Sequence, residues 1–136
     1  MPLLTIPLLD AGAFLDVGVG ASRSLTGPAN RPDTWRALID TGADMTVISS
    51  AVVAALQPQK LGTAPVGRAG GGRSFPLTYD VRLRFGGHAG PGRWYPAEAV
   101  EVQPATPNVD VLIGMDLLIR IDMGWAGPRR LVFLNH

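Results

Sequence analysis

The sequence predicts a single all-β domain that closes into a barrel and carries one or two short helices. Glycine and proline are frequent, with 17 and 12 copies among 136 residues, which favours short strands joined by turns over long helices. Apolar residues make up 46% of the chain, enough for one modest core. A closed barrel hides strand edges in so small a domain. No repeat or linker divides residues 1–136, so we expect one domain.

The first half of the chain alternates apolar stretches with turn-forming residues. Four strands are expected there, over residues 3–9, 14–19, 35–39 and 45–48. Ser49 or Ser50 is in position to cap a brief helix over residues 51–56, which Pro58 would stop. Residues 21–33 are rich in Ser, Thr, Gly and Pro and predict a loop.

The second half contains the clearest strand signal. Apolar and polar residues alternate with period two over residues 74–85, and a strand of that length is expected to bend or to belong to two sheets. Residues 109–113 are nearly all apolar, which predicts a short strand buried on both faces. One or two helical turns are expected over residues 114–119. The remaining strands are expected at residues 97–102, 121–125 and 131–134, the last two as a hairpin around Gly127-Pro128.

Charge and cysteine content exclude several function classes. The 12 basic and 11 acidic residues nearly cancel, so we expect no nucleic-acid partner, which would require clustered cationic charge. The pairs Arg68/Arg73 and Arg129/Arg130 are interpreted as solvated loop positions. Cysteine is absent, which excludes disulfides, thiolate metal sites and a cysteine nucleophile.

Neither a metal nor another cofactor is expected, because His88 and His136 do not have the spacing of metal ligands. The apolar N-terminus lacks a basic leading region and is interrupted by Pro7 and Asp10. It is therefore a poor signal peptide and too short to span a bilayer. We expect a cytoplasmic protein.

The tripeptide Asp40-Thr41-Gly42 is the chemically informative motif. An apolar strand leads into it and a second apolar stretch follows. The strand would direct the carboxylate of Asp40 out of the barrel, and the small Thr41 and Gly42 would let a second copy of the turn approach. One carboxylate cannot serve as both acid and base in peptide hydrolysis, and the chain holds one such turn. If the turn is catalytic, the active enzyme should be a pair of chains.

Two segments carry a resemblance to a known family. Residues 37–44, followed by Thr46-Val47-Ile48, closely resemble the active-site segment of the retropepsins, the single-domain aspartic proteases of retroviruses, retrotransposons and some cellular proteins. Residues 110–118 (DVLIGMDLL) are similar to the aliphatic-Gly segment before the family's C-terminal helix. The motifs occur in the family's order with a glycine-rich stretch between them, and the resemblance spans roughly residues 12–134.

The resemblance implies a retropepsin-like (acid protease) closed barrel with one lobe per chain. It also implies an aspartic endopeptidase that acts as a homodimer on a peptide or protein substrate. Asp40 would face Asp40 of a second chain, and two carboxylates a few ångströms apart would hold one proton between them. Aspartic proteases are the standard example of this shared titration. The ionised member would be general base for a water, while the protonated member polarises the scissile carbonyl.

The resemblance also assigns roles to the neighbours of Asp40. Thr41 would brace the two turns through hydrogen bonds between the chains, and Gly42 would offer its carbonyl oxygen to substrate. Ala43 and Asp44 would line the substrate groove, with Asp44 binding the substrate main chain; the alternative for Asp44 is capping of the turn. Residues 112–114 would pack under the active-site turn.

Residues 67–73 would form the flap, a hairpin that closes over bound peptide, with its tip near Gly70 or Gly71 and with Gly72 beside it. A phosphate-binding loop is one alternative, but the Gly-Lys-Ser/Thr ending and a convincing following helix are missing. A disordered loop without a role is the other alternative.

Two departures from the viral pattern matter. Many viral retropepsins carry an Arg after the glycine that matches Gly114, and this Arg pairs with the acid that matches Asp44. Here the position is Met115, which leaves Arg36 and Arg120 as candidate partners of Asp44. Viral enzymes also dimerise through interleaved N- and C-terminal strands, and residues 3–9 and 131–136 are apolar enough to do the same.

Two further functions compete with the protease. One is a catalytically silent retropepsin-like module for peptide binding or dimerisation, although nothing in the turn forbids chemistry. The other is a nucleotide-binding fragment, because residues 39–43 also resemble the first phosphate loop of sugar-kinase and actin-like folds. Those folds need two α/β domains with long helices, which this sequence lacks.

Overall fold

The computed structural model describes residues 2–21, 32–67, 70–87 and 92–136. These ranges form a small β-protein with two short helices, α1 (Ser50–Leu56) and α2 (Met115–Leu118), and a 3₁₀ turn, η1 (Gly127–Arg129). The strands are β1 (Leu3–Leu9), β2 (Gly12–Ala21), β3 (Trp35–Ile39), β4 (Val47–Ile48), β5 (Gln59–Thr63), β6 (Val66–Gly67), β7 (Arg73–Ser74), β8 (Leu77–Phe85), β9 (Tyr95–Glu101), β10 (Val111–Ile113), β11 (Asp122–Ala126) and β12 (Leu131–Asn135).

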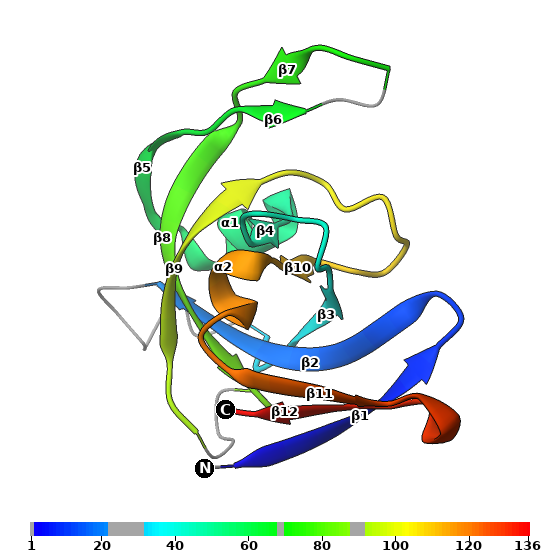
Figure 1. Ribbon diagram of the computed structural model, residues 1–136. Helices are drawn as coiled ribbons and strands as arrows, with labels where there is room; N and C mark the ends of the chain where they lie inside the picture. The colour runs from blue at the N-terminus through cyan, green and yellow to red at the C-terminus, as the bar shows by residue number, and fades with distance from the viewer. Residues whose placement is uncertain (1, 22–31, 68–69, 88–91) are drawn as a thin grey trace.

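Six strands close a barrel. Strands β2, β3, β10, β4, β9 and β8 pair in this order, and β8 pairs back onto β2 (Figure 1). Pairs β3–β10 and β4–β9 are parallel, whereas the other neighbours in this ring are antiparallel. The fully buried side chains that fill the interior include Val17, Val81, Phe85, Val111 and Ile113. The predicted all-β closed barrel with two short helices is therefore confirmed.

The long alternating segment forms β8, which belongs to two parts of the sheet, as expected. One edge of β8 pairs with β9 over residues 78–83. The other edge pairs first with β5 and then, from Val81, with β2. The strand begins at Leu77 and not at residue 74, because Pro76 has no N–H to donate to a ladder.

Strand β5 was not predicted. All five of its residues are exposed and mostly polar, so they carry no alternating signal. Its register against β8 also shifts between Lys60 and Gly62. Helix α1, by contrast, follows the prediction: the Ser49 side chain accepts a hydrogen bond from Val52 N, and Gln57 adopts the left-handed conformation at the C-terminal end.

The two ends of the described chain form a three-stranded extension that we call the terminal sheet, β11–β12–β1. Strands β11 and β12 are the predicted hairpin, joined through η1. In Figure 1 the terminal sheet lies at one end of the molecule, and the β6–β7 hairpin lies at the opposite end. Across the described ranges, no helix has the length and apolarity needed to cross a membrane.

Candidate active site

Parallel strands β3 and β10 bring the two sequence motifs together. Ile39 lies opposite Ile113 in this pair, so Asp40 and Gly114 follow at the same end of the barrel. Strand β4 pairs with the other edge of β10, which makes residues 40–46 a short connection across the end of β10. The expectation that residues 112–114 support the active-site turn is confirmed by this arrangement.

The backbone of the turn aligns the Asp40 carboxylate. Oδ1 of Asp40 accepts a hydrogen bond from Gly42 N at 3.0 Å. The Asp40 backbone N donates to Ile113 O at 3.0 Å, and its O accepts from Ala43 N at 3.2 Å. Asp40 is partly exposed, and Thr41, Gly42 and Asp44 are exposed. The carboxylate is thus held in place while the surface of the turn is open to another molecule.

Segment 113–116 clamps this turn from the side of the barrel. Met115 N donates to Ala43 O at 2.8 Å, and Asp116 N donates to Asp44 O at 3.2 Å. A Cβ atom at Gly114 would lie 2.6 Å from the backbone carbonyl carbon and oxygen of Met45. Two backbones therefore approach more closely here than any side chain allows, which explains the glycine before Met115.

Thr46 is a residue of the site to which the sequence reasoning assigned no role. Its side chain is fully buried. The hydroxyl donates to Asp116 Oδ1 at 2.8 Å and accepts from Gly114 N at 3.3 Å. A threonine between Met45 and Val47 was a weak signal of a buried polar link, but its partner 70 residues away is identified only by the structure.

Asp110 and Ser49 form a second polar link next to the first. Ser49 Oγ donates to Asp110 Oδ1 at 2.8 Å, and Ser49 N donates to Asp110 O at 2.8 Å. The same serine caps α1. The helix and the start of β10 are therefore attached at one residue, which stabilises the floor below the turn.

Neither arginine that was considered as a partner of Asp44 pairs with it. Arg120 donates to Pro96 O and lies over the Tyr95 ring, 5.6 Å from its centroid. Arg36 lies over the Phe14 ring at 5.1 Å. Within the described ranges, the Asp44 carboxylate forms neither an ion pair nor a hydrogen bond that would cap the turn. It is left free to meet another group.

The glycine-rich segment lies in a hairpin that projects past the barrel (Figure 1). Val66 pairs with Ser74 and Gly67 with Arg73. Gly70, Gly71 and Gly72 all have positive φ angles, of 88°, 97° and 86°. Arg68 and Ala69 lie outside the described residues. The chain leaves the glycines through strand β7 and not through a helix, which disfavours the phosphate-binding alternative.

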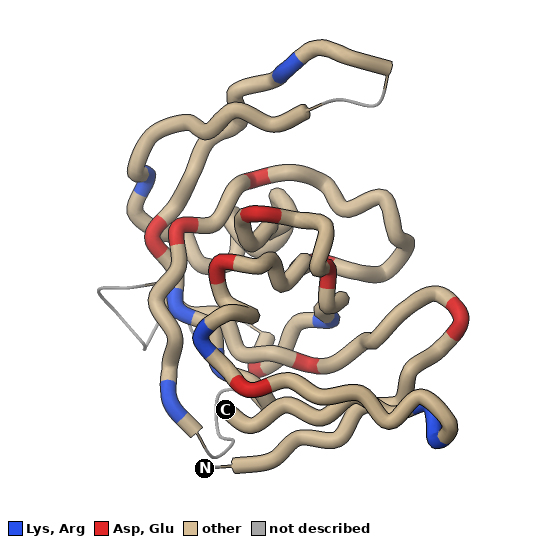
Figure 2. Tube along the Cα trace, viewed as in Figure 1, with Lys and Arg blue, Asp and Glu red and all other residues tan. Residues whose placement is uncertain are grey.

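Charge is distributed unevenly around the site. Figure 2 shows acidic positions on the turn after β3, on α2 and at the end of β9, while basic positions are spread over β3, β5, β7 and β8 and the segment after α2. Tyr79 of β8 donates to Glu101 Oε1 at 3.1 Å, and burial together with this carboxylate raises the pKa of Tyr79.

Among the described residues, no group of three or more His, Asp or Glu side chains is arranged to hold a metal ion.

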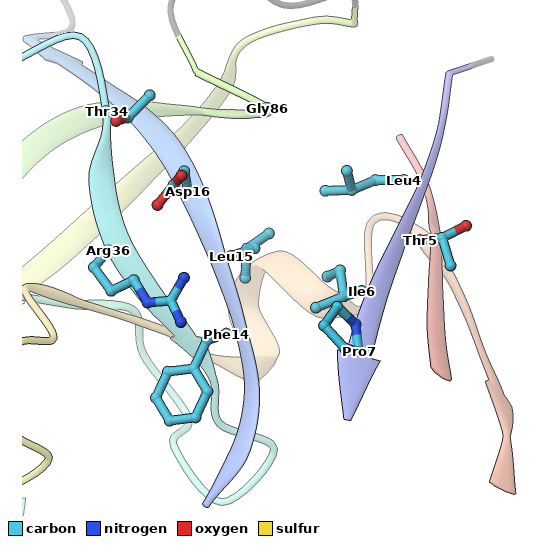
Figure 3. Close-up of a pocket in the computed structure, with 10 residues that line it drawn as sticks. All are labelled: Leu4, Thr5, Ile6, Pro7, Phe14, Leu15, Asp16, Thr34, Arg36 and Gly86. Atoms are coloured by element: carbon cyan, nitrogen blue, oxygen red, sulfur yellow. The ribbon is translucent and has the colours of Figure 1, made fainter. Parts of the chain in front are cut away.

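A cavity of about 330 Å³ lies elsewhere, between β1 and β2 (Figure 3). Its lining comes from β1, β2 and β3 together with Thr34 and Gly86, and it includes the stacked pair Arg36 and Phe14. No residue of the 40–46 turn lines it. The cavity is therefore separate from the candidate active site.

Comparison with known proteins identifies the family. Residues 27–120 match the model of a family described as "gag-polyprotein putative aspartyl protease". The chain belongs to this aspartyl protease family. Both motifs, Asp40-Thr41-Gly42 and the segment through Gly114, lie inside the matched range. A search of curated proteins found no match.

Solved structures of aspartic proteases share the fold. A retropepsin-like aspartic protease from Rickettsia conorii aligns with 99% of this chain and 91% of its own, at 16% identity and a TM-score of 0.66. The EIAV protease in complex with the inhibitor HBY-793 aligns with 82% of this chain and 89% of its own, at 18% identity and a TM-score of 0.56. The aspartic proteinase from Irpex lacteus aligns with 98% of this chain but only 46% of its own, at 11% identity and a TM-score of 0.53. This member of the family therefore has the retropepsin-like single-lobe fold.

Proposed function

We propose that the chain is an aspartic endopeptidase whose active form is a homodimer with the two Asp40 carboxylates at its centre. The observation that carries this proposal is the Asp40 side chain itself. Asp40 is partly exposed, its carboxylate is oriented by Gly42 N, and its backbone N donates to Ile113 O of the barrel. It belongs to a chain of an aspartyl protease family that contains one Asp-Thr-Gly turn.

The need for a second copy follows from the chemistry and agrees with chain length. Hydrolysis of a peptide bond needs a base for the attacking water and an acid for the carbonyl oxygen, and one carboxylate supplies only one of them at a time. This chain corresponds to 46% of the Irpex lacteus proteinase. Two copies would therefore match the length of that one chain and provide the second carboxylate.

In the proposed dimer, repulsion between the two carboxylates keeps one proton on the pair. The ionised Asp40 removes a proton from a shared water, which attacks the carbonyl carbon of the scissile bond. The protonated Asp40 donates to the carbonyl oxygen. The proton taken from water then passes from the pair to the leaving amine as the C–N bond of the tetrahedral intermediate breaks, and a hydroxyl proton of the intermediate returns to the pair as the carbonyl re-forms. The pair returns to a single shared proton at the end of the cycle.

The neighbours of Asp40 have geometry suited to substrate. The exposed Thr41 and Gly42 lie where a second turn and a peptide backbone would approach, and half-buried Ala43 would form part of the groove wall. The Asp44 carboxylate is exposed and unpaired within the described ranges, so it is available to accept hydrogen bonds from substrate N–H groups. The β6–β7 hairpin, with Gly70, Gly71 and Gly72 at its turn, would act as the flap.

The decisive experiment compares Asp40→Asn with the unmodified protein and with Asp16→Asn, a matched exposed carboxylate on β2. A peptide library would be digested at about pH 4 to 7 and the products identified by mass spectrometry, because the shared proton favours mildly acidic conditions. We expect Asp40→Asn to lower cleavage by about 10²- to 10⁴-fold or more, with circular dichroism and dimer mass unchanged. Cleavage by Asp40→Asn at the rate of Asp16→Asn would reject the mechanism.

A further inference from the structure

The ends of the described chain are paired with each other and are not available to a partner. Strand β1 pairs antiparallel with β12 over five residue pairs, from Leu3–Asn135 to Pro7–Leu131. His136 N also donates to Pro2 O at 2.9 Å. Interleaving of terminal strands between two copies, as in viral enzymes, would first require this pairing to break. The terminal sheet therefore offers a second copy only its two outer edges, on β1 and on β11.

The outer edge of β1 is poorly suited to further pairing. Only Leu8 and Leu9 of β1 pair with β2, after which the two strands separate. The cavity in Figure 3 occupies the space between them. Pro7 has no N–H to donate on this edge, and proline on an edge strand is a recognised protection against pairing with another chain.

The outer edge of β11 lacks such protection. β11 is the last strand in the sheet order, and its sequence Asp-Met-Gly-Trp-Ala contains neither Pro nor Lys. Trp125 has an exposed fraction of 53%, although its register partner Val132 is fully buried. An apolar strand edge of this kind is a site for pairing with another strand.

We propose that β11 pairs antiparallel with β11 of a second copy across a two-fold axis at Gly124. The two terminal sheets would then join into one sheet of six strands, in the order β1–β12–β11–β11–β12–β1. This proposal rests on the proposed function, since a lone Asp40 makes the site incomplete without a second copy. The same strand edge on both copies gives an isologous interface, the type that a two-fold axis requires.

The sequence of β11 is self-complementary in this register. With Gly124 opposite itself, Trp125 lies opposite Met123 of the second copy, so an exposed aromatic side chain gains an apolar cross-strand neighbour. Asp122 lies opposite Ala126, so the two acidic residues are at opposite ends of the pair and do not repel each other directly. At Gly124 itself, the absence of a side chain lets the two strands approach.

The position of β11 in the chain couples this interface to the active-site turn. Only residues 119–121 separate α2 from β11. The first residue of α2, Met115, is hydrogen-bonded to Ala43 of the turn. Pairing of the β11 strands would therefore orient both turns relative to the same two-fold axis.

Cysteine cross-linking tests the proposed axis directly. The chain has no cysteine, so Gly124→Cys introduces a single thiol. A Cβ atom at Gly124 meets nothing within 4 Å, so the variant should fold. Gly62→Cys is the matched control, because Gly62 is equally open and lies in β5, at the far end of the sheet order. Facing Cβ atoms about 4.5–5.5 Å apart in an antiparallel pair are within reach of a disulfide after a small shift.

We expect Gly124→Cys to form a covalent dimer under mild oxidation, or with a short bismaleimide, at least tenfold faster than Gly62→Cys on non-reducing gels. Equal cross-linking rates with both reagents would overturn the proposal. The bismaleimide spans a longer gap than a disulfide and would join facing cysteines whose geometry prevents a disulfide. A negative result with both reagents therefore cannot be caused by poor disulfide geometry.

Charge on the edge provides an independent test. Trp125→Lys should weaken the dimer at least tenfold in sedimentation equilibrium, whereas Leu3→Lys, 65% exposed on β1, should leave it unchanged. Unchanged dimerisation of Trp125→Lys would also reject the β11 interface. If Asp40→Asn abolishes cleavage while both β11 tests fail, the endopeptidase stands and this interface is wrong. If Asp40→Asn remains active, the endopeptidase mechanism itself is wrong, whatever the cross-links show.

Discussion

The active-site turn and the β6–β7 hairpin are both glycine-containing loops, but they are held in opposite ways. Hydrogen bonds from Asp40, Gly114, Met115 and Asp116 join the turn to the neighbouring segment, and buried Thr46 completes the link. The hairpin is paired through two residue pairs, and its three described glycines at the turn are exposed. The conformation of the active-site turn is therefore determined by many contacts and that of the hairpin by few.

This difference fits the tasks in the proposed enzyme. A carboxylate that shares a proton with its twin must be held within about 0.5 Å of its working position, which requires a rigid support. A flap must open for substrate and close over it, which requires a segment of low local stability. Glycine serves both purposes: at Gly114 it permits close packing, and at Gly71 it permits a positive φ.

The largest effect is expected when a methyl group is added at Gly114, which packs against the rigid active-site turn. Gly114→Ala places a Cβ atom 2.6 Å from the Met45 backbone, and backbone atoms cannot move aside cheaply. We expect a loss of about 3 kcal/mol or more in the free energy of unfolding, together with loss of cleavage. The measurement is urea denaturation at one fixed protein concentration, because dimerisation couples stability to concentration.

The matched control for that change lies in the hairpin. Gly67→Ala meets nothing within 4 Å and needs no positive φ, so we expect a change within about 0.5 kcal/mol. If the Gly114→Ala and Gly67→Ala variants have equal free energies of unfolding, the turn and segment 113–116 are free to separate. The turn would then not be held more firmly than the hairpin.

A smaller loss is expected from the buried hydroxyl. Thr46→Val preserves shape but removes the donor to Asp116 Oδ1 and the acceptor for Gly114 N. Leaving buried polar groups unpaired should cost about 1–3 kcal/mol and should lower kcat more than it raises KM. Thr46→Ser should restore most of the stability and most of kcat. Asp116→Asn should preserve the hydrogen bond from Thr46, since an amide oxygen still accepts it. If the serine variant is as impaired as the valine variant, packing and not the hydroxyl is responsible.

The smallest effect on stability is expected in the hairpin, although activity should still change. Gly71→Ala forces an L-residue to a φ of 97°, a strain of about 1–2 kcal/mol that local rearrangement of an exposed hairpin can relieve. We expect an unchanged free energy of unfolding and a severalfold loss in kcat/KM, mainly through KM, when peptide cleavage is measured. Gly67→Ala again serves as control. A large fall in stability would show that the hairpin is packed as tightly as the turn.

Much of the barrel could be predicted from local sequence. The bounds of β1 and β3 agree with the predicted ranges, and α1 begins one residue before its prediction. Period-two alternation identified β8, and a nearly apolar run identified β10. Strand β5 escaped prediction because its pairing with β8 does not depend on burial of its side chains, all of which are exposed. An exposed edge strand leaves little pattern in its own sequence.

The active-site region shows the same division. Asp40, Thr41 and Gly42 could be singled out because the turn requires particular residue types, whereas Ala43, Asp44 and Gly114 were singled out through the resemblance to the retropepsins. The bond from Thr46 to Asp116 and the failure of Arg36 and Arg120 to pair with Asp44 could not be foreseen. Each depends on where a long or buried side chain finds its nearest partner, and that is a property of packing across distant segments.

For this protein, the sequence by itself determined the all-β character and the Asp-Thr-Gly turn, because periodicity and turn chemistry act over a few neighbouring residues. Only the tertiary structure decided that β8 closes the barrel on β2, that Gly114 packs on the backbone of Met45, and that the terminal strands pair within one chain. Those outcomes depend on competition among strand edges and on close packing, which are settled when the whole chain has folded.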